Sequence, residues 1–478
     1  MVHETDTLLY QAGWITANQL FERMFSPLAL EWVFRDRFKG SLAKGIDRIN
    51  GFQFCARSAM EFEIVSGKCL DGSFRFAPYL EQLKLKGRGK EPRIISIPTI
   101  RDRVVLHQLQ KYLALVFPDQ VPRNVASSYV RQVALDVGAM HRPRAWVCST
   151  DIRKFYDSID QDRIVMLVSR KIKNQPVLSL IGHALRTPTV PKNTPRKQRS
   201  LFRQDTGVPQ GLAISNILAA IYMADVDQAM RAIPGLHYYR YVDDVLMYGD
   251  EKLVSSSFTS LKGRLSRRGL KLHSLNSEKT KFGPLDQEFA YLGYVFKLPE
   301  ITVRRVTVER FLQSIAAKIS DYKHNKSRRL EKFKYLTESR LVDIFYLELN
   351  EKITGAISQN KRYGWVAYFN QITNEKLLHE MDGAIRRMVS RVPELAVHGV
   401  NRLKKLARAY FSMKYDPRGG YIRDYDVVKT TAEKLSFLES RGRIDPAVAL
   451  TEVQILERYD HYIRLVLARM HEDEGEIY

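Results

Sequence analysis

The sequence predicts an α+β fold in which a mixed core is followed by a basic helical region. Three observations carry this prediction. Strand-like runs alternate with helical patterns up to about residue 300. Beyond that point the pattern becomes helical and basic, which is typical of an α+β core with helical appendages. The length of 478 residues corresponds to roughly three domains of about 150 residues, enough to bury a core without disulfides.

The elements can be predicted in chain order. Arg93–Pro98 alternates and is β-branched, so we expect a strand, and a helix follows it through Val104 and Leu109. We expect further strands at 145–150 and on both sides of a tight turn within 237–248. Residues 186–203 carry six basic residues and three prolines, which predicts an extended loop. The remaining predicted elements are helices at 215–230 and near the C-terminus, where Thr451 is the expected N-cap.

The charge balance points to a polyanionic partner. Lys plus Arg is 76 and Asp plus Glu is 53, which gives a net charge of +23. A surplus of this size is typical of proteins that bind nucleic acid or an anionic membrane surface. We find no lipidation signal and no basic amphipathic terminus, so we expect nucleic acid and no membrane partner.

The cysteines and the apolar segments favour a cytoplasmic location. The three cysteines show no metal-binding or disulfide spacing. The N-terminus lacks the basic and apolar regions of a signal peptide. The longest uncharged stretch, 206–224, contains Pro209, Gln210 and Gly211. Polar and helix-breaking residues of this kind disfavour a membrane-spanning helix.

Three acids form the predicted chemical centre. Asp151 ends a predicted strand, and Asp243 and Asp244 stand side by side near a turn between two apolar strands. A lone Asp-Asp pair more often lies in a solvated turn, but the flanking strands oppose that interpretation here. Neighbouring carboxylates repel one another unless a cation is present, and hard oxygen ligands select Mg²⁺. Two such ions can activate a 3′-hydroxyl and stabilise a leaving pyrophosphate.

A second element, Gly207 to Gly211, is a common turn when taken alone. It belongs to a series of six segments in a fixed order: 93–103, 151–156, 207–215, 241–244, 275–280 and 289–294. In this order the segments resemble the fingers motif, palm motifs A and B, the YxDD of motif C, motif D and the primer-grip motif E of bacterial retroelement reverse transcriptases, which include group II intron, retron and phage-defence enzymes.

The resemblance implies a right-hand polymerase fold. Fingers and palm with an antiparallel sheet would occupy 84–300, a helical thumb 301–390 and a helical C-terminal region 391–478. Residues 1–83 have no role that we can assign.

The resemblance also implies roles for individual residues. Asp151, Asp243 and Asp244, with the backbone carbonyl of Ile152, would bind two Mg²⁺ ions, with Mn²⁺ as the alternative cation. Lys86 and Arg93 would bind the triphosphate, and Lys279 would protonate the pyrophosphate. Tyr156 would exclude a ribose 2′-hydroxyl and so select dNTPs. Gln210 and Gly211 would contact nucleotide and template.

The resemblance is closest to the defence-associated, anti-phage enzymes. Motif B has Ser215-Asn216 where group II intron enzymes usually have Ser-Pro, and no cysteine follows Cys148. The segments 355–369 and 419–426 look similar to the defence-associated group. Such an enzyme would work with an RNA template or structured non-coding RNA, a DNA product and a second protein or another copy of itself.

A basic segment beyond the palm is the predicted RNA contact. Residues 321–334 hold six basic and two acidic residues with interleaved rings. The candidate contacts are Lys323, Lys326, Arg328 and Arg329. A solvated helix face is the alternative. The alternatives for the whole chain are template-independent or protein-primed DNA synthesis, a retron or intron enzyme, and an RNA-binding maturase.

Overall fold

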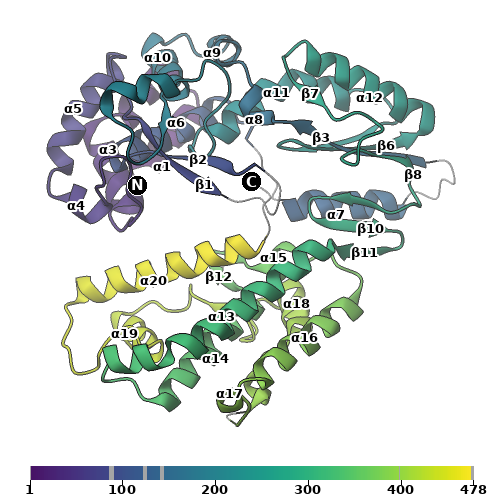
Figure 1. Cartoon of the computed structure of the whole chain (residues 1–478). Helices are drawn as coiled ribbons and strands as arrows, with labels where there is room; N and C mark the ends of the chain where they lie inside the picture. Colours follow the sequence, from purple (N-terminus) through teal and green to yellow (C-terminus); the bar gives the residue numbers. More distant parts are fainter. Residues whose placement is uncertain (1, 85–90, 122–125, 140–144, 398, 475–478) are drawn as a thin grey trace. The chain divides into compact units, whose positions relative to one another are not determined.

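The chain folds into two compact units of mixed helices and sheets. The computed structural model describes residues 2–84, 91–121, 126–139, 145–397 and 399–474. Unit 1 comprises residues 1–123 and 145–283, and unit 2 comprises residues 124–144 and 284–478 (Figure 1). The predicted α+β class is confirmed. No helix in the described ranges combines the length and the apolar character that crossing a bilayer requires.

Short helices form the N-terminal part of unit 1. Thr16 and Asn50 each form a reciprocal capping box, with Gln19 and Gln53 respectively, which fixes where two of these helices begin. These helices bury aromatic side chains in the same core as the palm. Their bounds are α1 Val2–Gln11, α2 Ala17–Met24, α3 Pro27–Val33, the π-helix η1 Phe34–Phe38, α4 Gly51–Cys55 and α5 Ser58–Leu70.

A small three-stranded sheet follows these helices. β1 (Tyr79–Lys84) and β2 (Arg93–Ile97) are antiparallel, and β4 (Thr189–Val190) runs parallel to β1 on its other edge. Helix α6 (Ile100–Val116) begins at the N-cap Thr99 and buries one broad face, as the sequence predicts. The prediction of an extended loop over 186–203 is partly wrong, because it contains β4 and the 3₁₀-helix η2 (Arg196–Phe202).

The main sheet of unit 1 is antiparallel, as predicted. Its order is β5-β6-β3-β7, with β8 also paired to β3, and α12 covers it in Figure 1. The strand predicted at 145–150 continues to Arg153. The bounds are β3 Ala145–Arg153, β5 His237–Tyr241, β6 Asp244–Asp250, β7 Lys271–Leu272 and β8 Lys281–Pro284. The surrounding helices are α8 Phe155–Ser158, α9 Gln161–Ser169, α10 Gln175–Arg186, α11 Ser215–Arg231 and α12 Glu251–Ser266.

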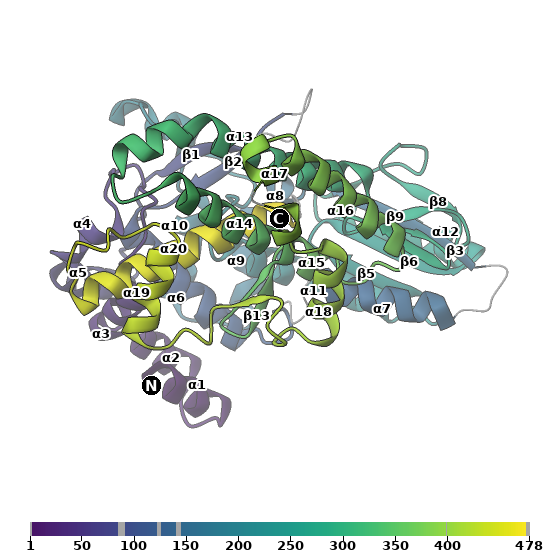
Figure 2. The same ribbon diagram turned by 90° about the horizontal axis from the view of Figure 1, so that it is seen from below.

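Besides α7, unit 2 comprises a three-stranded meander of order β11-β10-β9 and a mainly helical remainder, in which α13, α14, α16 and α18 can be followed in Figure 2. The meander belongs to this unit because the Thr373 amide donates to Ile301 (2.9 Å) and the Tyr294 hydroxyl donates to Tyr368 (2.6 Å). The division therefore falls at Gly283/Pro284, before the boundary near 300 that the sequence pattern suggests. The elements of this part are α7 Ala126–Ala139, β9 Phe289–Tyr291, β10 Tyr294–Lys297, β11 Glu300–Val303, α13 Arg305–Lys332, α14 Glu338–Thr354, α16 Glu375–Ser390 and α17 Pro393–Val397.

The expectation of an all-helical tail is wrong, because unit 2 contains a second sheet of order β13-β12-β14. A two-residue turn joins β12 to β13, and Gln359 and Asn360 have left-handed φ values of 51° and 58°. The Asp426 carboxylate accepts hydrogen bonds from both of their amides, at 2.6 and 2.9 Å. The remaining elements are β12 Ala356–Ser358, β13 Lys361–Tyr363, α15 Trp365–Tyr368, η3 Val400–Arg402, α18 Leu406–Tyr415, β14 Arg423–Asp424, α19 Thr431–Ser440 and α20 Glu452–Asp473.

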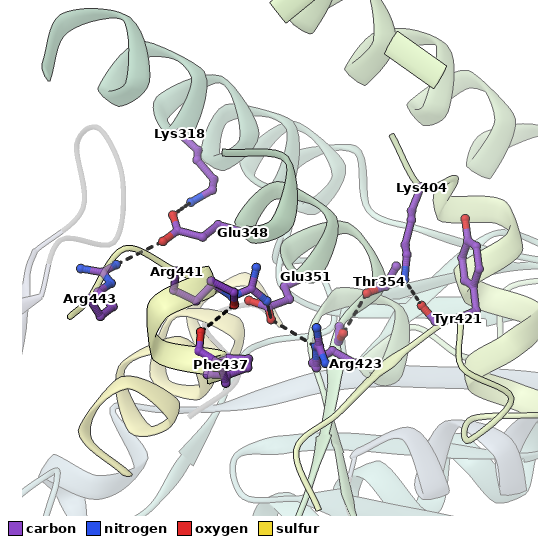
Figure 3. Close-up of polar contacts among 12 residues, drawn as sticks. Lys318, Glu348, Glu351, Thr354, Lys404, Tyr421, Arg423, Phe437, Arg441 and Arg443 are labelled. Atoms are coloured by element: carbon purple, nitrogen blue, oxygen red, sulfur yellow. Dashed lines mark hydrogen bonds and ion pairs between the residues drawn. The ribbon is translucent and has the colours of Figure 1, made fainter. Parts of the chain in front are cut away.

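A buried ionic network connects α14 to the segment that follows α19 (Figure 3). Glu348 accepts from Lys318 (2.7 Å) and Arg443 (3.1 Å). Glu351 pairs with Arg441, whose side chain is only 1% exposed. Burial raises the pKa of Glu351 despite Arg441 and Arg423. Burial also acts to raise the pKa of Glu348, but Lys318 and Arg443 outweigh it and hold this pKa below its usual value.

Candidate active site

The three predicted acids come together where β3 meets the β5–β6 hairpin. In the antiparallel register Asp151 lies directly opposite Asp244. The amide of Ile152 donates to the carbonyl of Asp243 at 3.0 Å. Cross-strand partners present their side chains on the same face of a sheet, so Asp151 and Asp244 face the same way. The sheet therefore brings together residues that are far apart in sequence.

The turn that carries Asp243 is held by a buried ion pair that the sequence analysis missed. Val242 adopts a φ of 55°, a strained value for a β-branched residue. Arg240 donates to the Val242 carbonyl (2.6 Å) and pairs with Asp227 of α11 (2.7 Å). Both side chains of that pair are 8% exposed. This contact fixes the strained turn against a helix.

Two nitrogen-bearing side chains face Asp151. Lys279 Nζ lies 3.3 Å and His273 Nε2 lies 3.5 Å from Asp151 Oδ2. The Thr150 and Thr280 hydroxyls, 2.9 Å apart, tie the segment that carries Lys279 to β3. The sequence analysis found Lys279 but missed His273, since a lone histidine just after the two-residue strand β7 carries no recognisable pattern.

Tyr156 contacts Asn216, the residue at which motif B departs from the group II intron pattern. Lys154, with a left-handed φ of 43°, turns the chain into α8. The Tyr156 hydroxyl then donates to Asn216 Oδ1 at the start of α11, at 2.6 Å. Burial and the nearby Asp243 raise the pKa of Tyr156, while Arg240 and Arg93 act in the opposite direction. Tyr156 thus belongs to the same cluster as Asp243 and Arg93.

The loop with Gln210 and Gly211 packs on β2. The Ser96 amide donates to the Gln210 carbonyl at 2.7 Å. Gly211 has a φ of 101°, and a Cβ there would lie 2.8 Å from Ile95 Cγ2 and 3.1 Å from the Ser96 carbonyl. The Gln210 amide also donates to Asp157 at 3.2 Å. The glycine is therefore required for the loop to approach the strand.

A cavity of about 300 Å³ lies beside this loop. Its lining includes Ser96 of β2, Asp157, and Gly207 and Gln210 of the loop. Phe202, which is 39% exposed, also contributes. The predicted nucleotide-binding residues Gln210 and Arg93 thus lie on elements that flank an open space, with Arg93 at the first position of β2, opposite Lys84.

The other predicted binding residues are Lys86 and four basic residues of α13. Lys86 lies outside the described residues. On α13 of unit 2, Lys323 and Arg328 are exposed and Arg329 is half-buried. Lys326 forms ion pairs with Glu338 (3.1 Å) and Glu394 (2.9 Å), and hydrogen bonding to Glu394 raises its pKa. Its charge is therefore already balanced within the protein.

The donor chemistry of the acid cluster fits a hard divalent cation. The possible ligands here are all oxygen atoms: the carboxylates of Asp151, Asp243 and Asp244 and the backbone carbonyl of Ile152. These residues are neighbours across the paired strands. Within the described ranges, no three His, Cys, Asp or Glu side chains already converge into a metal-binding group.

Known proteins resemble this chain in sequence and in fold. Residues 85–296 match the sequence model of the family described as "Reverse transcriptase (RNA-dependent DNA polymerase)". The chain is 24% identical to Protein YkfC of Escherichia coli over 300 residues, covering 54% of this chain and 76% of YkfC. It is 25% identical to the group II intron-encoded protein LtrA of Lactococcus lactis over 200 residues, covering 40% of this chain but only 31% of LtrA.

Among solved structures, telomerase from Candida albicans, in complex with a fragment of telomeric RNA, matches with a TM-score of 0.42 at 11% identity. That match covers 87% of this chain and 67% of the telomerase chain. The family match spans the strands and loops that carry Asp151, Asp243, Asp244, Tyr156 and Gln210. Residues 85–296 therefore form a reverse transcriptase domain, the domain of an RNA-directed DNA polymerase and hence of a nucleotidyltransferase.

Proposed function

We propose that the whole chain copies an RNA template into DNA at the acid cluster of unit 1. The register of β3 against the β5–β6 hairpin supports this proposal, because it sets Asp151 opposite Asp244 and joins the Ile152 amide to the Asp243 carbonyl. A protein that only binds RNA has no need of clustered carboxylates in a strongly basic chain.

Asp151, Asp243, Asp244 and the Ile152 carbonyl would hold two Mg²⁺ ions, or Mn²⁺ in their place. When bound, such ions activate a primer 3′-hydroxyl and neutralise the leaving pyrophosphate.

Five other residues act directly on the nucleotide. The Arg93 guanidinium binds the triphosphate and offsets the charge that develops on it. The Lys279 ammonium, held near Asp151, gives a proton to the pyrophosphate. The ring of Tyr156 excludes a 2′-hydroxyl. Gln210 and Gly211 position nucleotide and template against β2.

Primer extension on an RNA template tests the polymerase proposal. The Asp243→Asn variant should lose at least about 100-fold in rate, because metal binding supplies several kcal/mol of transition-state stabilisation. Asp250→Asn is the matched control, since Asp250 lies exposed at the far end of β6 and makes no capping bond. Equal activity of wild type and Asp243→Asn would overturn the proposal.

We further propose a role in anti-phage defence with an associated RNA. The two segments similar to defence-associated enzymes, 355–369 and 419–426, meet in one sheet, where Ala356 and Ile357 pair with Arg423 and Asp424. This pairing supports the interpretation that the two segments form one structural feature.

Plating a panel of phages on cells that express wild type or Asp243→Asn tests the defence role. Protection by wild type alone supports it. Equal protection by both proteins would favour an RNA-binding maturase type of function. DNA that remains covalently attached to the denatured protein would favour protein-primed synthesis.

A further inference from the structure

We propose that single-stranded RNA binds to one face of α18 in unit 2. The RNA-binding stripe consists of Lys404, Arg408, Phe411 and Tyr415, together with the adjoining ring of Tyr421. The choice of RNA over DNA rests on the proposed function, whereas the surface itself is argued from its charges and rings.

The stripe follows from the spacing of α18. Positions 408, 411 and 415 are separated by three and four residues, so they follow one another along one side of the helix, and Lys404 lies just before the N-cap Lys405. The opposite side is buried through Leu406, Ala407, Ala409, Tyr410 and Met413. The stripe is therefore the solvent-facing side of a helix that is anchored by its apolar side.

The stripe carries cations that form no ion pair among the described residues, although the Asp382 carboxylate accepts hydrogen bonds from the Leu406 and Ala407 amides at the start of α18. Residues 401–415 contain five basic and no acidic residues. Arg402 pairs with Asp343 at 2.7 Å. Among the described residues, Lys404, Lys405, Arg408 and Lys414 form no ion pair. This distinguishes the stripe from the face of α13, where Lys326 already has two carboxylate partners.

The cations are held close together around one ring. Lys404 Nζ lies 4.8 Å and Arg408 Cζ lies 4.4 Å from the centre of the Tyr421 ring. Lys404 also donates to the Tyr421 carbonyl at 2.5 Å (Figure 3). Burial, Arg423 and Arg408 lower the pKa of Lys404. Grouped cations of this kind repel one another, and a phosphate backbone would relieve that repulsion.

Two exposed rings continue the stripe. Phe411 is 38% and Tyr415 is 72% exposed. Their planes differ by 13°, their centres are 6.4 Å apart, and Lys414 lies 5.6 Å from the Tyr415 ring. Exposed rings beside cations stack unpaired bases, which a duplex keeps inside its own stack. An acidic protein would use the cations but leave these rings without a role.

Photo-crosslinking and anisotropy with a labelled single-stranded RNA of about 12 nucleotides test the proposal. The full-length Asp243→Asn protein should crosslink through the peptide that contains Phe411 and Tyr415. Replacing either ring with alanine should weaken binding about tenfold. Arg408→Gln should reduce the slope of log K against log salt by about 1. Lys376→Gln is the control, because Lys376 is exposed on α16 and approaches Glu380.

Several outcomes would overturn the inference. These are unchanged affinity in Phe411→Ala and Tyr415→Ala, crosslinks confined to unit 1, or tighter binding of DNA than RNA of the same sequence. Both rings are exposed, so the melting temperature should stay close to that of wild type. Primer extension by the wild type is measured in parallel, so failure of this surface can be separated from failure of the polymerase proposal.

Discussion

At the scale of single residues, the most informative contact is the hydrogen bond between Tyr156 and Asn216. Tyr156 occupies the position expected to select deoxynucleotides by excluding a 2′-hydroxyl. The ring can do this only if it is held in place, and the 2.6 Å bond to Asn216 Oδ1 holds it. The departure from Ser-Pro in motif B therefore has a structural consequence at the proposed gate.

Tyr156→Phe should lower the ratio of kcat/KM for a dNTP to kcat/KM for the matching rNTP about fivefold. A fivefold change corresponds to the free energy of about one hydrogen bond. The ring remains, so dNTP incorporation should change little. Asn216→Ala should have the same effect, and the double variant should add nothing because both changes remove one bond. Single-nucleotide kcat/KM values for both substrates measure this. Additive effects would show that the two residues act separately.

At the scale of elements, strain and buried charge fix the β5–β6 hairpin. Asp227 and Arg240 connect α11 to the turn that carries Asp243, and both side chains are almost fully buried. Removal of one member leaves an uncompensated charge in the interior.

Arg240→Met should destabilise unit 1 by about 3–5 kcal/mol, because it leaves the Asp227 carboxylate buried without its partner. The double variant with Asp227→Asn should recover part of this loss. Urea unfolding followed by tryptophan fluorescence gives the free energies. A single variant as stable as wild type would mean that the turn is held by other contacts.

The two members of the Glu351–Arg441 pair of unit 2 should differ in how much stability is lost when each is replaced. Glu351→Gln should cost about 3–5 kcal/mol at pH 7, because an arginine cannot lose its charge. Arg441→Met should cost less, since Glu351, whose pKa is already raised, can take up a proton. A raised folded-state pKa favours the folded state at low pH. The loss of unfolding free energy caused by Arg441→Met, relative to wild type, should therefore become smaller as pH falls from 7 toward 5. Urea unfolding at several pH values measures this loss. A deficit that stays constant over this range would contradict the assignment.

At the scale of the whole molecule, the sequence predicted the centre of the site better than its surroundings. Asp151, Asp243 and Asp244 could be found because each stands at the end of a strongly patterned strand. His273 and Arg240 could not be found, since their importance depends on contacts between distant segments. The small sheet of unit 2 was missed because strands of two or three residues carry no periodicity.

The net charge of +23 leads to a prediction about the intact protein. Lys and Arg outnumber the acids, and the four basic residues around the RNA-binding stripe make no ion pair within the described part of the chain. RNA binding should therefore release many counterions. If it involves six or more phosphates, affinity should fall by roughly 10³-fold or more between about 50 and 200 mM salt. Anisotropy titrations at several salt concentrations measure this slope. A nearly flat slope would mean that stacking, and not charge, holds the RNA. The net positive charge would then not account for RNA binding.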